Sequence, residues 1–320
     1  MFTEASVNGS LSQTELDEIF RQNLEAQDPP GWASAYSPEI FKVTNTTHSS
    51  YFGKVHRGPG FFSQIGEVTT VPTYQATVAN KYTVVIAPFA ESIDISKDLV
   101  DDDLHSEWQA QVAEFAYAAR ESQSYNAFGL FRNAFTTTLT PDGSAFISTS
   151  HALIGGGTQS NRLVTANISG AASTVLTTAA VQVAQKILAE MKAQSGISAR
   201  CVGDILLTAP ANFFAANQIA RSALVAENSN NGINTLSMVY ALRPLQSNYL
   251  AASFGGSDTA WFLMDSRKHA VRRFVRQGLQ TALRDWSFSN NRTYNYQANY
   301  REAYAVTDYI GVVGATGDAT

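Results

Sequence analysis

The sequence predicts a mixed α+β fold, and three observations support this prediction. Residues 51–90 are β-like, with β-branched runs that glycines and prolines interrupt. Residues 204–208 form a strand pattern that leads into a helix opened by Pro210, an alternation typical of a compact unit with its own core. The third observation is a helical stripe of apolar residues at i, i+4, i+7, i+8 and i+11, formed by Trp108, Val112, Phe115, Ala116 and Ala119.

The helix that carries this stripe is the longest one that the sequence predicts. Its apolar pattern extends through Tyr125 to Phe131, and acidic and amide side chains occupy the opposite face. At 1.5 Å per residue, roughly 30 residues span roughly 45 Å. Because such a length exceeds what a compact domain needs, we expect this helix to act as a strut.

Three aspartates, Asp101 to Asp103, stand before this helix. Carboxylates can bind Ca²⁺ or Mg²⁺, but the triplet lacks the spaced ligands and the glycine of an EF-hand loop. Negative charge is also favourable at the start of a helix, where the macrodipole is positive. We therefore expect the triplet to mark the helix start, and we predict no metal site.

Composition favours an oligomer. Only 15% of the 320 residues are charged, against about 25% in a typical soluble domain. Interface cores are depleted in charge, so a subunit that buries much of its surface against copies of itself fits this composition. The net charge of −5 argues against a dedicated nucleic-acid binder. The single cysteine, Cys201, excludes an intrachain disulfide, and its apolar neighbours indicate a buried structural thiol.

The start of the chain carries no sign of export. Residues 1–4 provide neither a basic n-region nor an apolar h-region, and no apolar run approaches the roughly 18 residues of a membrane span. We therefore expect the protein to be made and kept inside a cell, or released only when that cell opens, and to have no membrane partner.

The first 90 residues contain little that could form a core. Ser12 and Glu15 form a capping-box pattern at the start of one short amphipathic helix, but residues 33–50 are polar and carry scattered aromatic residues. Strands are predicted at 68–71 and 82–86, and such a two-stranded excursion is marginal alone. We expect both segments to lie against a neighbour, from this chain or another.

Two basic groups have alternative interpretations. Lys54, His56 and Arg57 are either solvated loop charges or contacts to another subunit or a phosphate. The arginines around Arg272 either bind nucleic acid or alternate on a strand face with carboxylate partners, and the second interpretation is favoured. The predicted contacts between subunits are Lys54, His56, Arg57, Phe61, Phe62, Lys81, Arg272 and Arg273.

The most distinctive sequence segment is residues 141–151, together with the glycines at 155–157. Ser148 or Ser150 with His151 could suggest a hydrolase, but no Gly-x-Ser-x-Gly elbow surrounds either serine. Triads assemble in space, so this absence alone leaves a hydrolase open. The glycines lack the Gly-Lys-Ser/Thr of a phosphate-binding loop. We favour a turn at 142–143 and a hydrogen-bonded structural histidine, with no catalytic residue and no cofactor.

The second half of the chain alternates between helix and strand patterns. A helix begins near Thr174, with an apolar face that ends at 195–196. Further strands are predicted at 236–240, 261–265, 269–275 and 310–313.

The order of these segments resembles the major capsid proteins of tailed phages, in particular the Mu-like major head subunit branch of the HK97-type fold. The resemblance covers most of residues 50–313. Its matching parts are short, and their order and spacing carry it. They are Asn80-Lys81-Tyr82 before Ile93-Asp94-Ile95, Leu99-Val100-Asp101-Asp102-Asp103, Asp142-Gly143-x-x-Phe146-x-Ser148 with Ser150-His151, Gly156-Gly157 with Ser160-Asn161, and Asp204-Ile205-Leu206-Leu207-x-x-Pro210.

The resemblance implies a layout in four parts. Residues 1–50 would form the N-terminal arm, and 51–90 an extended β-hairpin loop, the E-loop, that reaches over a neighbouring subunit. Residues 91–160 and 256–320 would form the peripheral domain, with a spine helix at about 102–133. The axial domain, at 161–255, would pack around the five- and six-fold positions of the shell.

The function that the resemblance implies is that of a major capsid protein, not an enzyme. It would assemble non-covalently, as pentamers and hexamers, into an icosahedral or prolate shell in the host bacterial cytoplasm. Its partners would be portal and scaffolding proteins, with cement proteins as an optional addition and double-stranded DNA held by nonspecific contacts. No motif carries over the covalent crosslink of some relatives, so none is predicted. The alternatives are an encapsulin-like cargo compartment and the hydrolase considered above.

Overall fold

The computed structural model describes residues 12–25, 28–67, 70–75, 77–102, 107–154, 156–168, 173–224, 232–288 and 291–318. Its α-helices are α1 (Gln13–Leu24), α2 (Lys97–Asp101), α3 (Glu107–Arg132), α4 (Thr178–Glu190), α5 (Pro210–Arg221) and α6 (Thr235–Val239). Short 3-10 turns occupy Thr165–Asn167, Asn248–Leu250, Ala252–Phe254 and Trp286–Phe288. The strands are β1 (Lys42–Asn45), β2 (Ser50–Arg57), β3 (Thr77–Val85), β4 (Ala87–Ser96), β5 (His151–Ala152), β6 (Thr158–Gln159), β7 (Ile205–Thr208), β8 (Arg243–Gln246), β9 (Trp261–Met264), β10 (Val271–Arg284), β11 (Thr293–Val306) and β12 (Val312–Ala315).

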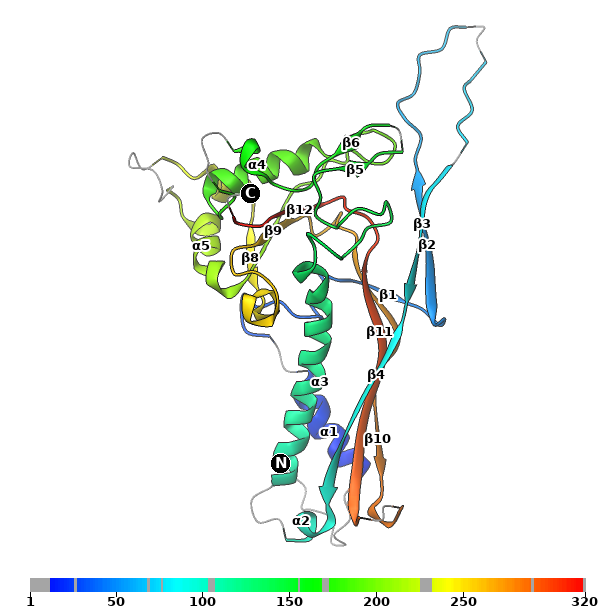
Figure 1. The fold of residues 1–320 in the computed structure, drawn as a ribbon, viewed down its shortest axis with the longest axis vertical. Coiled ribbons are helices and arrows are strands. Elements are labelled where there is room, and N and C mark those ends of the chain that lie inside the picture. The colour runs from blue at the N-terminus through cyan, green and yellow to red at the C-terminus, as the bar shows by residue number, and fades with distance from the viewer. Residues whose placement is uncertain are drawn as a thin grey trace.

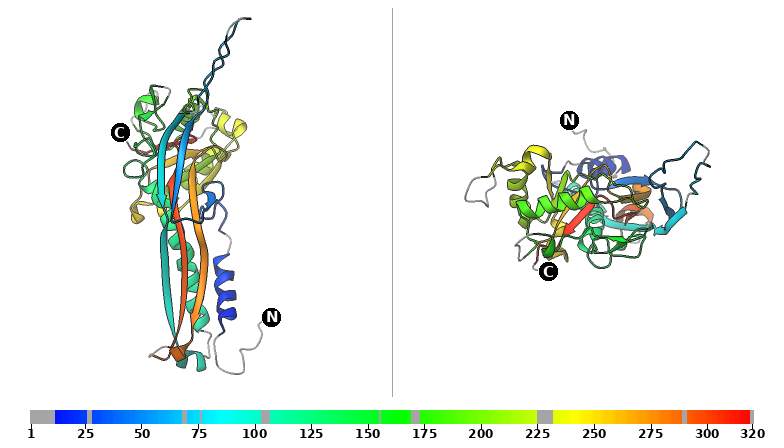
Figure 2. Two further views of the ribbon diagram at one scale, coloured as in Figure 1. Left: turned by 90° about the vertical axis from the view of Figure 1, so that its right-hand side faces the viewer. Right: turned by 90° about the horizontal axis from the view of Figure 1, so that it is seen from above.

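The lower part of the molecule is a long shaft (Figure 1). A four-stranded sheet, in the order β1-β10-β11-β4, runs along α3, and α1 packs beside that helix (Figure 2). Leu16 and Phe20 of α1 enter a buried cluster with Phe115 of α3 and Tyr296 of β11. The amphipathic helix predicted after Ser12 is confirmed, and the Ser12 hydroxyl accepts a hydrogen bond from the Glu15 N–H at 3.3 Å. The segment that could form no core alone therefore uses the core of the shaft.

The upper part is a compact α/β unit with a second sheet, in the order β12-β9-β7-β8. Strands β7, β9 and β12 are buried along their whole length, as expected of a sheet covered on both faces. The face of α4 that carries Val181 and Leu188 packs on this sheet, and Ile219 of α5 joins the same cluster. The predicted strands at 204–208 and 261–265 and the helix after Pro210 are confirmed.

The C-terminal end of α3 connects the two parts. Phe128 and Phe131 lie in a cluster with Phe41 and with Phe262 of β9. The strut predicted from the apolar stripe thus runs from the shaft into the floor of the compact unit. No helix in the described part of the chain is both long and apolar enough to cross a membrane.

A β-hairpin made of β2 and β3 projects beyond the compact unit (Figures 1 and 2). Its first strand was not predicted, because Gly53 interrupts the apolar pattern of β2. The glycine has a packing reason: a Cβ at this position would lie 1.9 Å from Cζ of Tyr82 on the facing strand. The predicted strand at 82–86 is confirmed by β3. Of the strand predicted at 68–71, residues 68 and 69 lie outside the described residues, and Thr70 and Val71 are not in a strand.

The predicted start of the long helix is wrong. Asp101 and Asp102 do not begin this helix: Asp101 ends the short helix α2, which Ser96 caps by accepting a hydrogen bond from the Leu99 N–H at 3.2 Å. The described part of α3 begins at Glu107, and Asp103 lies outside the described residues. A local serine cap therefore places a helix start earlier than the acidic triplet suggested.

Two more predictions need correction in the second half of the chain. Residues 236–240 are not a strand, because Asn234 caps the helix α6 by accepting a hydrogen bond from the Leu236 N–H at 3.1 Å. The helix predicted to end at 195–196 stops at Glu190, and Gly196, with φ +84°, lies in the following turn.

Candidate assembly surface

The root of the hairpin is anchored and its tip is not. Tyr51 of β2 lies 4.8 Å, centroid to centroid, from the ring of Phe274 in β10, and Val84 and Ile86 join Phe274 in a small buried cluster. The described residues between β2 and β3, 58–67 and 70–75, contain no helix or strand, and we call them the hairpin tip. Phe61 is 82% exposed and Phe62 is 94% exposed. Two adjacent aromatic side chains in water on the loop of a projecting hairpin mark an interaction surface.

The stem of the hairpin holds two lysines directly opposite each other. Lys54 and Lys81 are register partners, both are exposed, and neither has an ion-pair partner among the described residues. Like charges facing each other across a strand pair are destabilising. The arrangement becomes favourable when an anionic group from another molecule lies against the stem.

His56 and Arg57 continue this basic stem towards the tip. His56 is exposed, whereas Arg57 is half-buried and its backbone carbonyl accepts a hydrogen bond from the hydroxyl of Tyr74. In the described part of the chain, Nε of Arg57 is buried without a hydrogen-bond partner. The hairpin thus brings six of the eight predicted contact residues onto one projecting element: Lys54, His56, Arg57, Phe61, Phe62 and Lys81.

The remaining two predicted residues lie in β10, away from the tip. Arg272 is half-buried and donates a hydrogen bond to the hydroxyl of Thr44 at 3.3 Å. Arg273 is buried, forms an ion pair with Glu302 at 2.7 Å and stacks over the ring of Tyr36. Burial raises the pKa of Glu302, although Arg273 and the Tyr304 hydroxyl oppose this shift. Arg273 therefore has the carboxylate partner that the strand interpretation expected, and its guanidinium is used within the subunit.

The distinctive stretch around His151 forms a closed hydrogen-bond network instead of a triad. Nδ1 of His151 lies 2.7 Å from Asp142 Oδ2, and Nε2 lies 3.1 Å from Asn161 Oδ1. The ring is fully buried and stacks on Tyr309, with centroids 3.9 Å apart. Neither Ser148 nor Ser150 is a hydrogen-bond partner of His151 among the described residues.

Asp142 and Asn161 hold this network to the backbone. The Asn161 amide donates to Phe146 O, and its Oδ1 accepts from the Ser148 N–H, both at 2.8 Å. Burial raises the pKa of Asp142, but hydrogen bonds from His151, Thr140 and the Ser144 N–H outweigh it and leave this pKa below its ordinary value. A charged carboxylate whose oxygens already accept these bonds is a structural group. The predicted turn at 142–143 is present, with Gly143 at φ +83°.

Cys201 and His269 are two further buried groups. Burial raises the pKa of the Cys201 thiol, as expected of a structural cysteine. Burial and the nearby Lys42 lower the pKa of His269 to about 4, and its Nε2 lies 2.9 Å from the carbonyl oxygen of Glu39. No local pattern predicts the His269 contact, because Glu39 is 230 residues away in the chain.

Comparison with known proteins agrees with this architecture. The model of a family described as phage capsid protein matches residues 81–315, and the chain belongs to this family. Comparison of the sequence with curated proteins finds no match.

Solved phage structures share the fold at low sequence identity. A chain of Mycobacterium phage Cain is 17% identical, with a TM-score of 0.55 over 97% of this chain and 99% of that one. A chain of Microbacterium phage Oxtober96 is 11% identical, with a TM-score of 0.54 over 91% and 94%. The capsid of a native GTA particle gives 13% identity and a TM-score of 0.55 over 91% and 92%. The fold is therefore of the HK97 type, and the chain is a major capsid protein of the tailed-phage class. The Mu-like branch stays a prediction.

Proposed function

We propose that this capsid protein assembles non-covalently, as pentamers and hexamers, into a closed icosahedral or prolate shell in which each hairpin lies over a neighbouring subunit. The observation that carries the proposal is the projecting hairpin itself. Its tip exposes Phe61 and Phe62, and its stem places Lys54 opposite Lys81. Both features are unfavourable in an isolated chain and are relieved by contact with a second copy.

The assignment of residues to domains follows the layout that the resemblance implies. We assign residues 1–50 to the arm, 51–90 to the E-loop, 91–160 and 256–320 to the peripheral domain, and 161–255 to the axial domain. The separate buried clusters of the shaft and of the compact unit support this assignment. An encapsulin-like compartment is not favoured, because the matching family is one of phage capsid proteins.

The contents and further partners of the shell belong to the same proposal. With a net charge of −5, the subunit would hold packaged double-stranded DNA by confinement and weak nonspecific contacts. Portal and scaffolding proteins would join it, with cement proteins as an optional addition, and assembly would take place in the host cytoplasm. Because no crosslinking motif was found around Lys54 or Lys81, shells should dissociate into single chains in denaturing gels.

The test is electron microscopy with sedimentation of the purified chain, expressed alone. Wild type should form closed shells, and the double variant Phe61→Asp/Phe62→Asp should stay unassembled with an unchanged melting temperature. Gln64→Asp is the matched control, because it adds a charge to the same loop but keeps both rings. Loss of shells in the control as well, or intact shells in the double variant, would contradict a role for the tip.

A further inference from the structure

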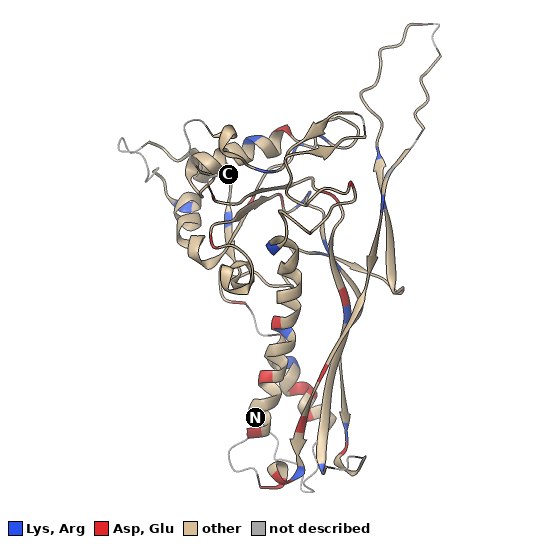
Figure 3. Cartoon of the chain, in the orientation of Figure 1, with Lys and Arg blue, Asp and Glu red and all other residues tan. Residues whose placement is uncertain are grey.

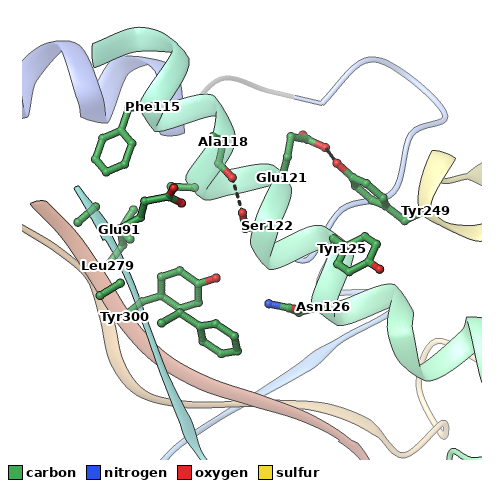
Figure 4. A pocket seen from close by; sticks show the side chains of 14 residues that line it. Glu91, Phe115, Ala118, Glu121, Ser122, Tyr125, Asn126, Tyr249, Leu279 and Tyr300 are labelled. Carbon is green, nitrogen blue, oxygen red and sulfur yellow. Dashed lines mark hydrogen bonds between the residues drawn. The ribbon is translucent and has the colours of Figure 1, made fainter. Parts of the chain in front are cut away.

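A groove lies between α3 and β4, the strand at one edge of the long sheet (Figure 4). It exists because the side chains of α3 become small at Ala118, Ala119 and Ser122, whereas Phe115 fills the space one turn earlier. Its volume is about 510 Å³, within the range of roughly 300–1,000 Å³ over which proteins hold small molecules. Ala118 and Ser122 are exposed, so the groove is accessible from solvent.

Aromatic rings form the walls of the groove. Phe89 of β4 stacks on Tyr300 of β11, with centroids 5.0 Å apart, and Tyr125 packs edge-on against Tyr249 at 5.7 Å. One of these rings already binds a cation, since the guanidinium carbon of Arg132 lies 3.9 Å from the centroid of Tyr125. Ring faces attract cations, and the methylene chain of a cationic group packs well on apolar surface. The walls therefore suit a ligand that combines positive charge with a hydrocarbon chain.

The groove also contains two carboxylates from different elements. Glu91 of β4 and Glu121 of α3 are its charged lining residues (Figure 4). Among the described residues, neither forms an ion pair with a Lys or Arg. The hydroxyl of Tyr249 donates a hydrogen bond to Oε2 of Glu121, and Arg120, the next residue in the chain, pairs instead with Asp28 at 2.7 Å. The groove thus presents two negative charges that no lining Lys or Arg balances.

The surroundings of the groove restrict its ligand. Acidic side chains are spaced along α1, α3 and β4 of the shaft, and such a surface repels phosphate groups (Figure 3). Ca²⁺ and Mg²⁺ require about six oxygen ligands. In the part of the chain that the structure describes, no group of three or more His, Cys, Asp or Glu could hold a metal ion. Two carboxylates on separate walls, with aromatic rings beside them, match two positive charges joined by a hydrocarbon chain.

We propose that the groove between α3 and β4 binds a linear aliphatic diamine or polyamine. One ammonium group pairs with Glu91 and a second with Oε1 of Glu121, which the Tyr249 hydrogen bond leaves available. The methylene chain between them packs on the rings of Phe89 and Tyr300. Alkylammonium groups resemble the lysine side chain, whose pKa is about 10.4, so both charges are present at neutral pH. The site is separate from the hairpin tip, and the inference does not depend on assembly.

The test is calorimetric titration of the full-length, unassembled chain, separated from any particles by sedimentation, with putrescine. Butylamine is the matched control ligand, because it has the same four-carbon chain but one ammonium group. Putrescine should bind at least about tenfold more tightly, the factor expected for one additional hydrogen bond between charged groups. Equal affinities for the two amines, or no binding of putrescine, would overturn the proposal.

Glu91→Gln tests the carboxylate of β4. Glu91 is exposed, so the substitution removes a charge without disturbing the core, and putrescine should then bind about tenfold more weakly, like butylamine. The matched variant is Glu114→Gln, at an exposed position of α3 that does not line the groove. It should leave the affinity unchanged. Equal weakening by both variants would show a general attraction to the acidic shaft and would overturn the site.

Ser122→Trp tests the space itself without changing the charge. Ser122 is exposed and its hydroxyl donates to Ala118 O within the helix, so the indole can fill the groove while the melting temperature stays that of wild type. Putrescine binding should be lost, and retained affinity would show that the groove is not the binding site. Magnesium chloride should not displace putrescine at equal concentration. Displacement by Mg²⁺ would show that double charge alone is recognised, and it would overturn the role of the aromatic walls.

Discussion

Two irregular segments of this molecule, the hairpin tip and the loop around His151, differ in whether their side chains are buried and paired within the chain. The loop closes on itself: His151 is fully buried between Asp142, Asn161 and Tyr309. The tip leaves Phe61 and Phe62 in water. A segment without regular secondary structure can bury its side chains and pair its polar groups within its own chain, and it then contributes to folding. A segment that leaves apolar side chains exposed instead contributes to assembly. Substitutions in the two segments should therefore affect different equilibria.

The largest effect on stability is expected from His151→Ala. The substitution leaves the Asp142 carboxylate, whose side chain is 4% exposed, without its main partner. Leaving a buried carboxylate without one of its hydrogen-bond donors costs about 1–3 kcal/mol or more, and the void left by the ring adds to this loss. Chemical denaturation should show a loss of this size in the free energy of unfolding.

The matched control for His151→Ala is Ser150→Ala, at the next position in the chain but exposed. It should change the free energy of unfolding by less than about 0.5 kcal/mol. A His151→Ala chain as stable as the control would show that the network is not what holds the loop.

Asp308 provides a smaller, pH-dependent test of the same region. Burial raises its pKa to about 6, above the ordinary value of 3.8, and Asp142 adds to this shift. Because the folded state holds the proton more tightly than the unfolded state, stability falls as pH rises from about 4 to above 6. Asp308→Asn removes this loss and should stabilise the chain by about 2 kcal/mol at pH 7.5 but not at pH 4.

The measurement for Asp308→Asn is the free energy of unfolding of variant and wild type at both pH values. Asparagine keeps the side-chain oxygen that accepts from the Ile310 N–H. A stabilisation that is equal at pH 4 and pH 7.5 would show that the burial of charge is not its cause.

Much of the architecture could be predicted from local patterns. The stripe on α3, the cap at Ser12 and the strand before Pro210 are short-range signals, and each gave the right element. The structural role of His151 was also predicted, because no nucleophile-elbow motif surrounds the neighbouring serines. These features depend on residues that are neighbours in the sequence.

The rest depends on contacts between distant parts of the chain. Strand β2 was hidden because the fit of Gly53 against Tyr82 exists only after the hairpin forms. A strand was predicted at 236–240 because the apolar residues of this segment do not indicate that Asn234 caps the helix α6. A groove between α3 and β4 joins residues from β4, α3 and β11 (Figure 4), so no linear pattern could reveal it. Sequence patterns therefore do not predict which surfaces pack together, and assembly depends on the same kind of contact.

The smallest predicted change in folding comes with an opposite change in assembly, at Lys54. Lys54→Glu replaces a like-charged pair by a favourable pair with Lys81, which should stabilise the hairpin stem by about 0.2–1 kcal/mol. The same substitution reverses the charge that the stem presents to an anionic group of a neighbouring subunit, so the fraction of assembled chains should fall, most strongly at low salt. The melting temperature of unassembled chains and sedimentation at two ionic strengths measure the two effects, with Lys54→Gln as the uncharged control. If Lys54→Glu shells form as readily as wild type, the stem does not lie on an acidic surface, and the lysine pair is only a local cost of the hairpin.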